Sequence, residues 1–387
     1  MTRVIVPVGK LATAFVLALA LAACGTIEIV QDKNYARVRV GAEDAKALPA
    51  RDVAPYVVGY ALLSLAAYDD ALYGVAKPLA TGSREAVAQR DDDQAFGTLA
   101  RPWLAPWALA ETLINDCRGA PSPRRDFGFG GREGDCTLDE SPRGRILDGL
   151  GLQVWTHGRQ EFGRQESGRQ GTRFCREVIL GFRGTDRSQR DDWRSNFRFL
   201  TRVLPLYDQY EQVQDHIGPI LDRVERYPCY RRGRTEIVAI GHSLGGGLAQ
   251  QAAYRDGRVR RVFAFDPSFV TGYYDLDPKK RVDNSRGLKI ERVYEHGEIL
   301  AYPRLLLRNV YPPSACDPQI RHIRFNLIDG GSILAQHSLA TLTAGLLELA
   351  KGKAGSPDND GFLPISPYAS RRTGKCLPAD AIARAGP

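Results

Sequence analysis

The stretch "AIGHSLGGGLAQ", residues 239–250, decides how the rest of the chain is interpreted. It places Ser243 between Gly241 and Gly245, directly after a run of apolar residues. A serine nucleophile needs a sharp turn from a strand into a helix, with small flanking residues so that its hydroxyl protrudes. The pattern therefore predicts a nucleophile elbow at Ser243, and the competing interpretation is a glycine-rich packing turn.

The segments on either side of Ser243 favour the elbow. The preceding run "EIVAI", residues 236–240, is typical of a buried strand, and the following run, residues 244–257, predicts a helix that ends near Gly257. In that setting the amide of Leu244 would lie at the positive end of the helix and point at a developing oxyanion.

Strands and helices are expected to alternate along the central part of the chain. Apolar runs with the length of strands occupy residues 151–155, 177–182, 259–266, 288–295 and 320–328. A mostly buried helix is predicted over residues 53–73, and one apolar helix face is formed by Tyr210, Val213, Ile217, Ile220, Leu221 and Val224. This order predicts an α/β domain with a largely parallel sheet flanked by helices.

The N-terminus predicts export. A cationic start precedes the apolar run Leu11–Ala23, which is the layout of a secretory signal peptide and is too short to span a bilayer. The run ends in "LAAC", residues 21–24, which resembles the lipobox of bacterial lipoproteins. The resemblance implies removal of residues 1–23, lipidation of Cys24 and, because Gly25 follows, an outer-membrane location facing the periplasm. The alternative is an ordinary signal peptide followed by a coincidental cysteine.

The charge balance suits an anionic membrane surface. The chain of 387 residues has a formal net charge of +8, which falls to +6 without residues 1–23 because Arg3 and Lys10 are lost. An arginine-rich composition that implies no partner explains the same excess. Nucleic acid is not expected as a partner, because no recognition motif is present and an envelope location separates the protein from it.

Six cysteines remain besides Cys24, and an even number in an oxidising compartment favours disulfides. Cys175 and Cys229 each precede a strongly apolar stretch, and these two stretches could be neighbouring strands, so we expect this pair to bond. No C-x-x-C or H-E-x-x-H pattern occurs, and neither a metal nor another cofactor is predicted.

The expected organisation is one elaborated domain over residues 53–350, after a linker of residues 24–52. An insertion or loop region rich in Arg, Asp, Gly and Pro lies near residues 84–145, and residues 351–387 form an irregular tail. Within the domain, residues 157–171 repeat Gly-Arg-Gln and predict a polar hairpin tip, or alternatively a contact with anionic headgroups.

Several motifs beyond the elbow resemble the class 3 lipases. The strand "VILGFRGTD" is similar to that family's strand ending in F-R-G-T, "DDWRSNF" to its D-W-x-x-N segment, "GHSLGG" to its commonest elbow and "LSLAAYDD" to its N-terminal helix. The resemblance covers residues 53–350 in broken pieces. It implies an α/β-hydrolase fold and hydrolysis of acyl esters, often of lipids, without a cofactor.

The resemblance also implies a second oxyanion donor. Thr185 in "FRGT" matches the family residue whose backbone amide, and often hydroxyl, fills this role, although a plain strand-end turn is the alternative. Two donors are needed because the loss of one typically costs about a hundred- to a thousandfold in turnover.

The catalytic base is expected to follow the nucleophile and the acid in the chain. Only His296, His322 and His337 follow Ser243. His322 alternates within a predicted strand, whereas His337 lies directly before an apolar helix, where the family keeps its catalytic histidine. His337 is therefore the predicted base, and a structural histidine at the helix start is the alternative.

The acid is where the sequence departs from the family. The segment "RVYEHGEILAYPR", residues 292–304, resembles R-V-x-x-x-x-D-x-V-P and sets Glu298 where an Asp is usual. A glutamate can orient the imidazole as an aspartate does, at a different reach. Asp266 in "FAFDPS" is the main alternative, and Glu295 is a weaker one.

Together these features predict a serine hydrolase that cleaves acyl esters, lipase-like, esterase-like or phospholipase-like, through a Ser-Glu-His triad and an acyl-enzyme intermediate. The apolar segment of residues 196–207 would be a lid that suits an acyl chain, or a helix packed into the core. The alternative function is a catalytically silent, membrane-anchored lipoprotein that uses the fold as a binding scaffold.

Overall fold

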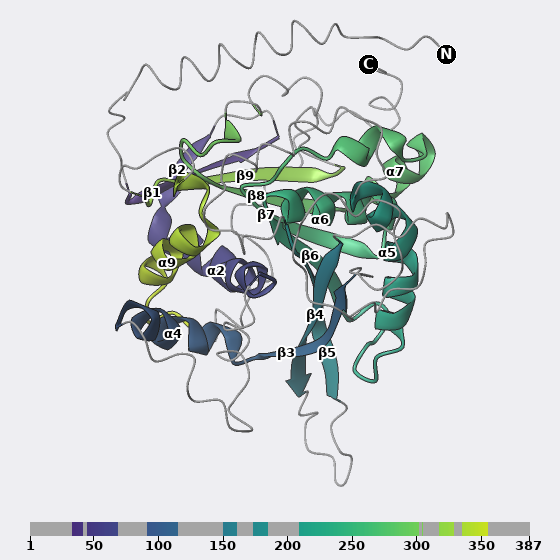
Figure 1. Ribbon diagram of the computed structural model, residues 1–387, viewed down its shortest axis with the longest axis horizontal. Coiled ribbons are helices and arrows are strands. Elements are labelled where there is room, and N and C mark those ends of the chain that lie inside the picture. Colours follow the sequence, from purple (N-terminus) through teal and green to yellow (C-terminus); the bar gives the residue numbers. More distant parts are fainter. Residues whose placement is uncertain are drawn as a thin grey trace, which may run out of the picture.

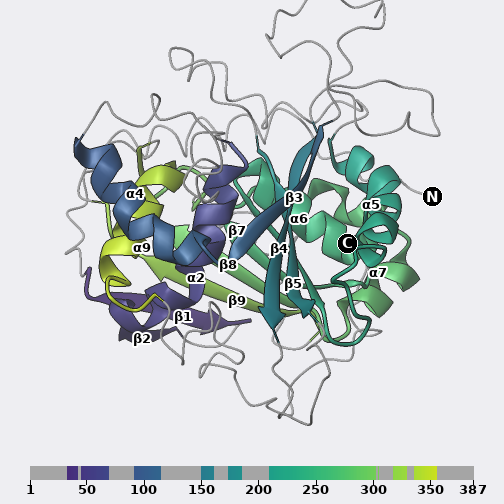
Figure 2. The same cartoon turned by 90° about the horizontal axis from the view of Figure 1, so that it is seen from below.

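The computed structural model describes residues 33–41, 45–68, 91–114, 150–160, 173–184, 209–301, 304, 317–328 and 335–354. These residues form a nine-stranded sheet with helices on both faces (Figures 1 and 2). The strand order is β2-β1-β9-β8-β7-β6-β5-β4-β3. The predicted α/β class is confirmed.

The sheet is parallel at its centre and antiparallel at both edges. The parallel block consists of β5 (Arg173–Phe182), β6 (Glu236–His242), β7 (Val259–Phe265), β8 (Lys289–Glu295) and β9 (Gln319–Phe325). The antiparallel edges are β4 (Gly151–Gln160) with β3 (Trp107–Ile114), and β1 (Tyr35–Val40) with β2 (Lys46–Pro49). The sheet is thus mixed, and the expectation of a largely parallel sheet holds only for its central strands.

Helices cover the two faces in separate groups. One face carries α2 (Ala50–Ala66), α4 (Asp91–Leu104) and α9 (Leu339–Leu349), and the other carries α5 (Gln209–Glu225), α6 (Leu244–Arg255) and α7 (Pro278–Ser285) (Figure 2). Because side chains alternate along a strand, Val238 and Ile240 of β6 join the core under α2, while Ile237 and Ala239 join the core under α6. Among the described helices, none is both long and apolar enough to cross a membrane.

Two segments contain more regular structure than their composition predicts. The expected linker of residues 24–52 contains β1 and β2, and the expected insertion near residues 84–145 contains α4 and β3. In β1, exposed and buried residues alternate strictly, which is the period of a strand with one buried and one exposed face. The arginines in the exposed positions of β1 conceal this pattern in the sequence.

The end of β9 also differs from its prediction. The strand stops at Phe325, although the apolar run continues to Ile328. The amides of Leu327 and Ile328 donate to the Glu295 carboxylate, at 2.8 and 3.2 Å, instead of to a neighbouring strand. A buried side chain thus replaces the sheet ladder there.

The predicted disulfide between Cys175 and Cys229 is confirmed. Their Cα atoms are 5.0 Å apart, and the Cys175 amide donates to the Cys229 carbonyl at 2.8 Å. The bond joins β5 to the loop before β6, and β5 and β6 are neighbours in the sheet. Cys117, Cys136, Cys316 and Cys376 lie outside the described residues, as does most of the Gly-Arg-Gln repeat between β4 and β5.

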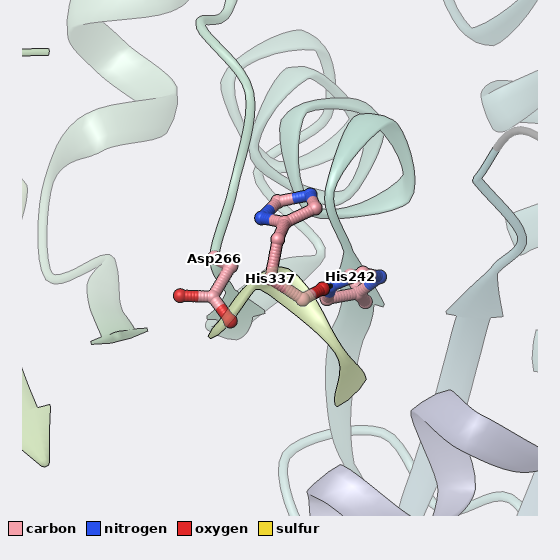
Figure 3. A group of neighbouring side chains, drawn as sticks. All are labelled: His242, Asp266 and His337. Carbon is pink, nitrogen blue, oxygen red and sulfur yellow. Dashed lines mark hydrogen bonds between the residues drawn. The ribbon is translucent and has the colours of Figure 1, made fainter. Parts of the chain in front are cut away.

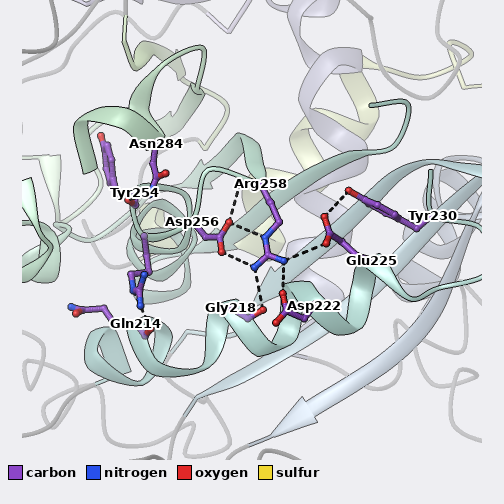
Figure 4. A network of polar contacts seen from close by, with 10 residues as sticks. Gln214, Gly218, Asp222, Glu225, Tyr230, Tyr254, Asp256, Arg258 and Asn284 are labelled. Atoms are coloured by element: carbon purple, nitrogen blue, oxygen red, sulfur yellow. Dashed lines mark hydrogen bonds and ion pairs between the residues drawn. The ribbon is translucent and has the colours of Figure 1, made fainter. Parts of the chain in front are cut away.

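A polar network fixes α5 beside the start of β7 (Figure 4). The guanidinium of Arg258 bonds Asp222 at 2.6 Å and Asp256 at 2.8 Å, and lies 3.6 Å from Glu225. It also donates to the Gly218 carbonyl at 3.3 Å. Since α5 packs against α6, this network supports the helix that follows the elbow.

Candidate active site

Ser243 lies in a strained turn between β6 and α6. Its φ of 54° and ψ of −122° fall in a region that residues other than glycine rarely adopt, and such strain persists only where the surroundings hold it. Here the Ser243 amide donates to the Phe265 carbonyl and its carbonyl accepts from the Ser268 amide, both at 2.9 Å. The end of β7 therefore holds the turn on both sides.

The two flanking glycines are required by space. A Cβ on Gly241 would lie 2.4 Å from the backbone of Gly245, and a Cβ on Gly245 would lie 2.3 Å from the Phe182 carbonyl oxygen. Real Cβ atoms do not approach backbone so closely, so neither position admits a side chain. The turn has the strand, the helix and the small neighbours that the sequence predicts for an elbow.

The structure brings together Ser243, His337 and Glu298. The Oγ of Ser243 is 3.0 Å from Nε2 of His337, and Nδ1 of His337 is 2.8 Å from Oε2 of Glu298. The histidine ends the short helix η3 (Ala335–His337), and the glutamate follows β8. With Nδ1 donating to the carboxylate, Nε2 is left to accept the serine proton. The three groups form one hydrogen-bond chain.

The Glu298 carboxylate is held by two further groups. Its Oε2 also accepts from the Leu300 amide at 2.8 Å, and its Oε1 forms an ion pair with Arg304. Arg304 in turn donates to the Pro267 carbonyl at 2.8 Å and lies 4.4 Å above the ring of Tyr294. Sequence reasoning missed Arg304, although a lone cation in the apolar run "ILAYPRLLL" is a signal that could have found it.

Neither alternative acid takes the position of Glu298. Asp266 uses Oδ1 to accept from the Glu295 amide at 3.0 Å, and in the described part of the chain its Oδ2 has no hydrogen-bond partner. Burial raises the pKa of Asp266 to about 6 and the pKa of Glu295 to about 7. Asp266 binds the amide of the last residue of β8 and Glu295 binds an amide after β9, whereas Glu298 bonds the His337 ring.

Asp266 also belongs to a group with His242 and His337 whose polar atoms lie within 4.8 Å of one another (Figure 3). Such residue types can bind a transition metal. Both ring nitrogens of His337, however, already bond Ser243 and Glu298, and Nε2 of His242 lies 3.1 Å from the His337 carbonyl. A metal ligand from His337 would have to break this hydrogen-bond chain, so the arrangement suits proton transfer better than metal binding.

Tyr68 joins the end of β5 to the elbow. Its hydroxyl accepts from the Gly184 amide and donates to the His242 carbonyl, both at 3.0 Å. A Cβ on Gly184 would lie 2.2 Å from that hydroxyl oxygen. Tyr68 stands within "LSLAAYDD", but the sequence alone did not indicate its role, because the contact joins segments more than 100 residues apart.

The remaining predicted residues are only partly described. Leu244 is the first residue of α6, a position at which the amide has no intrahelical partner. Thr185, Cys24 and the candidate lid of residues 196–207 lie outside the described residues. His322 lies within β9, as predicted, and its Nδ1 is 3.1 Å from the Tyr294 hydroxyl.

Comparison with known proteins places a phospholipase-like segment at the elbow. Residues 153–265 match a phospholipase-like family, the Tle-like phospholipase domain. The match runs from within β4 to the end of β7, and Glu298 and His337 lie beyond it. A search of curated proteins found no match. The family match supports a lipase-like or phospholipase-like ester hydrolase and does not single out the class 3 lipases.

Proposed function

We propose that this protein is a serine hydrolase of the α/β-hydrolase fold that cleaves acyl esters of phospholipids, with Ser243 as nucleophile, His337 as base and Glu298 as acid. The observation that carries the proposal is the hydrogen-bond chain from Ser243 through His337 to Glu298 at a strained elbow. The phospholipase-like match across the elbow supports the choice of substrate class.

The proposed reaction has two halves. First, Nε2 of His337 takes the Ser243 proton while Oγ attacks the ester carbonyl, and the same proton then passes to the departing alcohol. This leaves an acyl group on Ser243. A water molecule then attacks the acyl-enzyme, with His337 as base, and releases the carboxylic acid and free serine. The amides of Leu244 and Thr185 would stabilise both oxyanions.

Glu298 and Arg304 have supporting roles in this proposal. The carboxylate of Glu298 orients the His337 ring and stabilises its imidazolium form. Arg304 is a positioning residue, because it binds the Glu298 oxygen that does not face His337. The pair thus keeps the carboxylate from turning away from the imidazole.

The sequence features outside the described residues complete the proposal. Lipidation of Cys24 would anchor the mature chain in the bacterial envelope, at the outer membrane facing the periplasm. The apolar segment of residues 196–207 would cover the acyl chain. An enzyme anchored this way meets phospholipid as part of a membrane surface rather than as a free molecule.

Fatty acid release from phospholipid vesicles tests the proposed activity. The wild-type protein is expected to release fatty acid, and Ser243→Ala should lower the rate at least about a thousandfold. Ser285→Ala, a buried serine in α7, is the matched control and should retain activity. Binding of vesicles without any release by the wild type would favour the silent scaffold instead. Equal rates for wild type and Ser243→Ala would reject Ser243 as nucleophile.

A further inference from the structure

Four arginines gather on one face of the sheet, outside the site described above. Arg37 and Arg39 come from β1, Arg324 from β9 and Arg292 from β8, and we call them the arginine patch. The first three side chains are exposed, and Arg292 is half-buried. They lie on the face that carries α6, which packs over β5, β6 and β7.

The register of the strands fixes the arginines of this cluster next to one another. Arg37 stands directly opposite Arg324 across the β1–β9 pair, and His322 lies between Arg39 on one side and Arg292 on the other. Like charges directly opposite each other destabilise a sheet. The chain therefore carries an electrostatic cost at this position that folding alone does not explain.

The residues that the structure describes do not neutralise the charge of the arginine patch. Within the part of the chain that the structure describes, none of its four members forms an ion pair with a carboxylate. Partial burial, together with the nearby charges of Arg37 and Arg39, lowers the pKa of Arg324. Burial and the neighbouring arginines also hold the pKa of His322 well below its usual value, so that this ring adds no charge.

An aromatic side chain extends the same face. Tyr35 is 47 % exposed, and it shares the face of Arg37 and Arg39 because alternate residues of a strand point the same way. Tyrosine is enriched at membrane–water interfaces, where its ring meets the acyl boundary and its hydroxyl meets the headgroups. An exposed tyrosine beside exposed arginines is thus the composition of a lipid-facing surface.

The position of the arginine patch suits the proposed substrate. β9 runs parallel to β8, and Arg324 lies next to the carboxyl end of β9, at the sheet edge where Ser243 and Glu298 follow their strands. Tyr35, at the start of the antiparallel β1, lies toward that same edge. Two members of the lipid-facing surface, Arg324 and Tyr35, thus lie toward the sheet edge where the proposed reaction takes place.

We propose that the arginine patch, with Tyr35, docks the protein onto an anionic phospholipid surface. The inference rests on the proposed function, which supplies a bilayer as substrate, and charge complementarity selects the occupant. Each cation near an anionic membrane contributes about 1 kcal/mol to binding. Loss of two arginines should therefore weaken binding to anionic vesicles about thirtyfold.

Vesicle sedimentation tests this surface. The full-length chain carrying Ser243→Ala is used throughout, so that vesicles are not consumed and the binding result does not depend on hydrolysis. The measured quantity is the ratio of affinities for vesicles of phosphatidylcholine with phosphatidylglycerol and of phosphatidylcholine alone. The N-terminal segment, with Arg3 and Lys10, is the same in the parent and in every variant, so its contribution cancels when their ratios are compared. With three exposed arginines at about 1 kcal/mol each, we expect a ratio of at least about a hundred for the parent, and a fall of about thirtyfold with Arg37→Gln and Arg324→Gln.

Matched variants separate a lipid surface from other occupants. Arg51→Gln with Lys279→Gln removes two exposed cations elsewhere and should change the ratio less than about threefold. Arg37→Lys with Arg324→Lys should retain the ratio, because a membrane surface responds to charge rather than to guanidinium shape. A parent ratio near one, or equal losses for the patch and control variants, would overturn the proposal. A lower affinity ratio in the lysine variant would also overturn it. So would competition by inorganic phosphate at constant ionic strength, because either result indicates a discrete phosphate site.

Discussion

The carboxylate of Glu298 is completely buried and meets the His337 ring, the Leu300 amide and Arg304 together. A buried charge is tolerated only when such partners compensate for its lost hydration. Its orientation is therefore set by its surroundings, and the proposed imidazolium would form beside a fixed negative charge.

Glu298→Gln is expected to lower turnover by several orders of magnitude, because the amide keeps the size but loses the charge that favours the correct tautomer and the imidazolium. Asp266→Asn should cost far less, since its side-chain oxygen can still accept from the Glu295 amide. Turnover of a short soluble ester, measured on folded protein, checks both. A greater loss for Asp266→Asn would move the proposed acid to the preceding strand.

Arg304→Gln should lower kcat about ten- to a hundredfold with little change in KM, as expected for loss of a positioning contact. Without the nearby cation, the protonated His337 becomes easier to form, so the acidic limb of the kcat/KM profile should move to higher pH. Arg304→Lys should keep that limb near its original position. An unchanged pH profile in Arg304→Gln would reduce this residue to a structural role.

At this scale the sequence named three residues that the structure joins in one hydrogen-bond chain, and it missed the residues that hold them in place. Ser243, His337 and Glu298 could be named because their neighbours in the chain are distinctive. Tyr68 and Arg304 act through contacts with the Gly184 amide and the Glu298 carboxylate, which depend on folding. A local sequence pattern does not predict contacts between residues that are far apart in the chain.

At the scale of elements, the ends of β7 and β8 carry two carboxylic acids whose pKa values are higher in the folded protein than in the unfolded chain. Burial raises the pKa of Asp266 from 3.8 to about 6 and that of Glu295 from 4.5 to about 7. The folded protein therefore binds these protons more tightly than the unfolded chain, and the free energy of unfolding should fall as pH rises from about 4 to about 7.

Asp266→Asn is expected to flatten this decline, because it removes one titrating group and keeps the hydrogen bond to the Glu295 amide. The difference between variant and wild type should approach about 3 kcal/mol by neutral pH. Denaturant unfolding at a series of pH values measures it, with the exposed Asp275→Asn as control. The same slope in Asp266→Asn and wild type would contradict the assignment.

The elements that could be predicted are those whose apolar residues have a clear period. The central strands and α5 follow from such patterns, and the turn at Ser243 follows from its glycines. In β1, the buried residues Ala36, Val38 and Val40 alternate with exposed ones, but arginines in the exposed positions made the segment resemble a linker. β3 was missed for a related reason, because it lies in a region whose overall composition favours loops.

For the whole molecule, the proposed lipid anchor and the arginine patch would act together. β1 begins eleven residues after Cys24, so the anchor and Tyr35 are linked by a short stretch of chain. Two weak attachments on one molecule strengthen each other when both reach the same surface. The sequence predicted the anchor, whereas the patch required the strand register that only the fold provides.

Cys24→Ser is expected to replace detergent-dependent membrane attachment by attachment that high salt releases, because the acyl chains would be lost and only the arginine patch would still hold the membrane. Cell fractionation measures the distribution, and incorporation of labelled palmitate into the wild type is the positive control. Palmitate labelling that persists in Cys24→Ser, or extraction that still requires detergent, would contradict the proposed lipidation.

The central claim is that Ser243 is an activated nucleophile, and intact mass measurement after treatment with a fluorophosphonate tests it most directly. The wild-type protein should gain one adduct, located on Ser243 by peptide mapping, and Ser243→Ala should gain none. Labelling should slow strongly in His337→Ala, since the base no longer takes the serine proton. A folded wild-type protein that gains no adduct, or an adduct that persists in Ser243→Ala, would contradict the account.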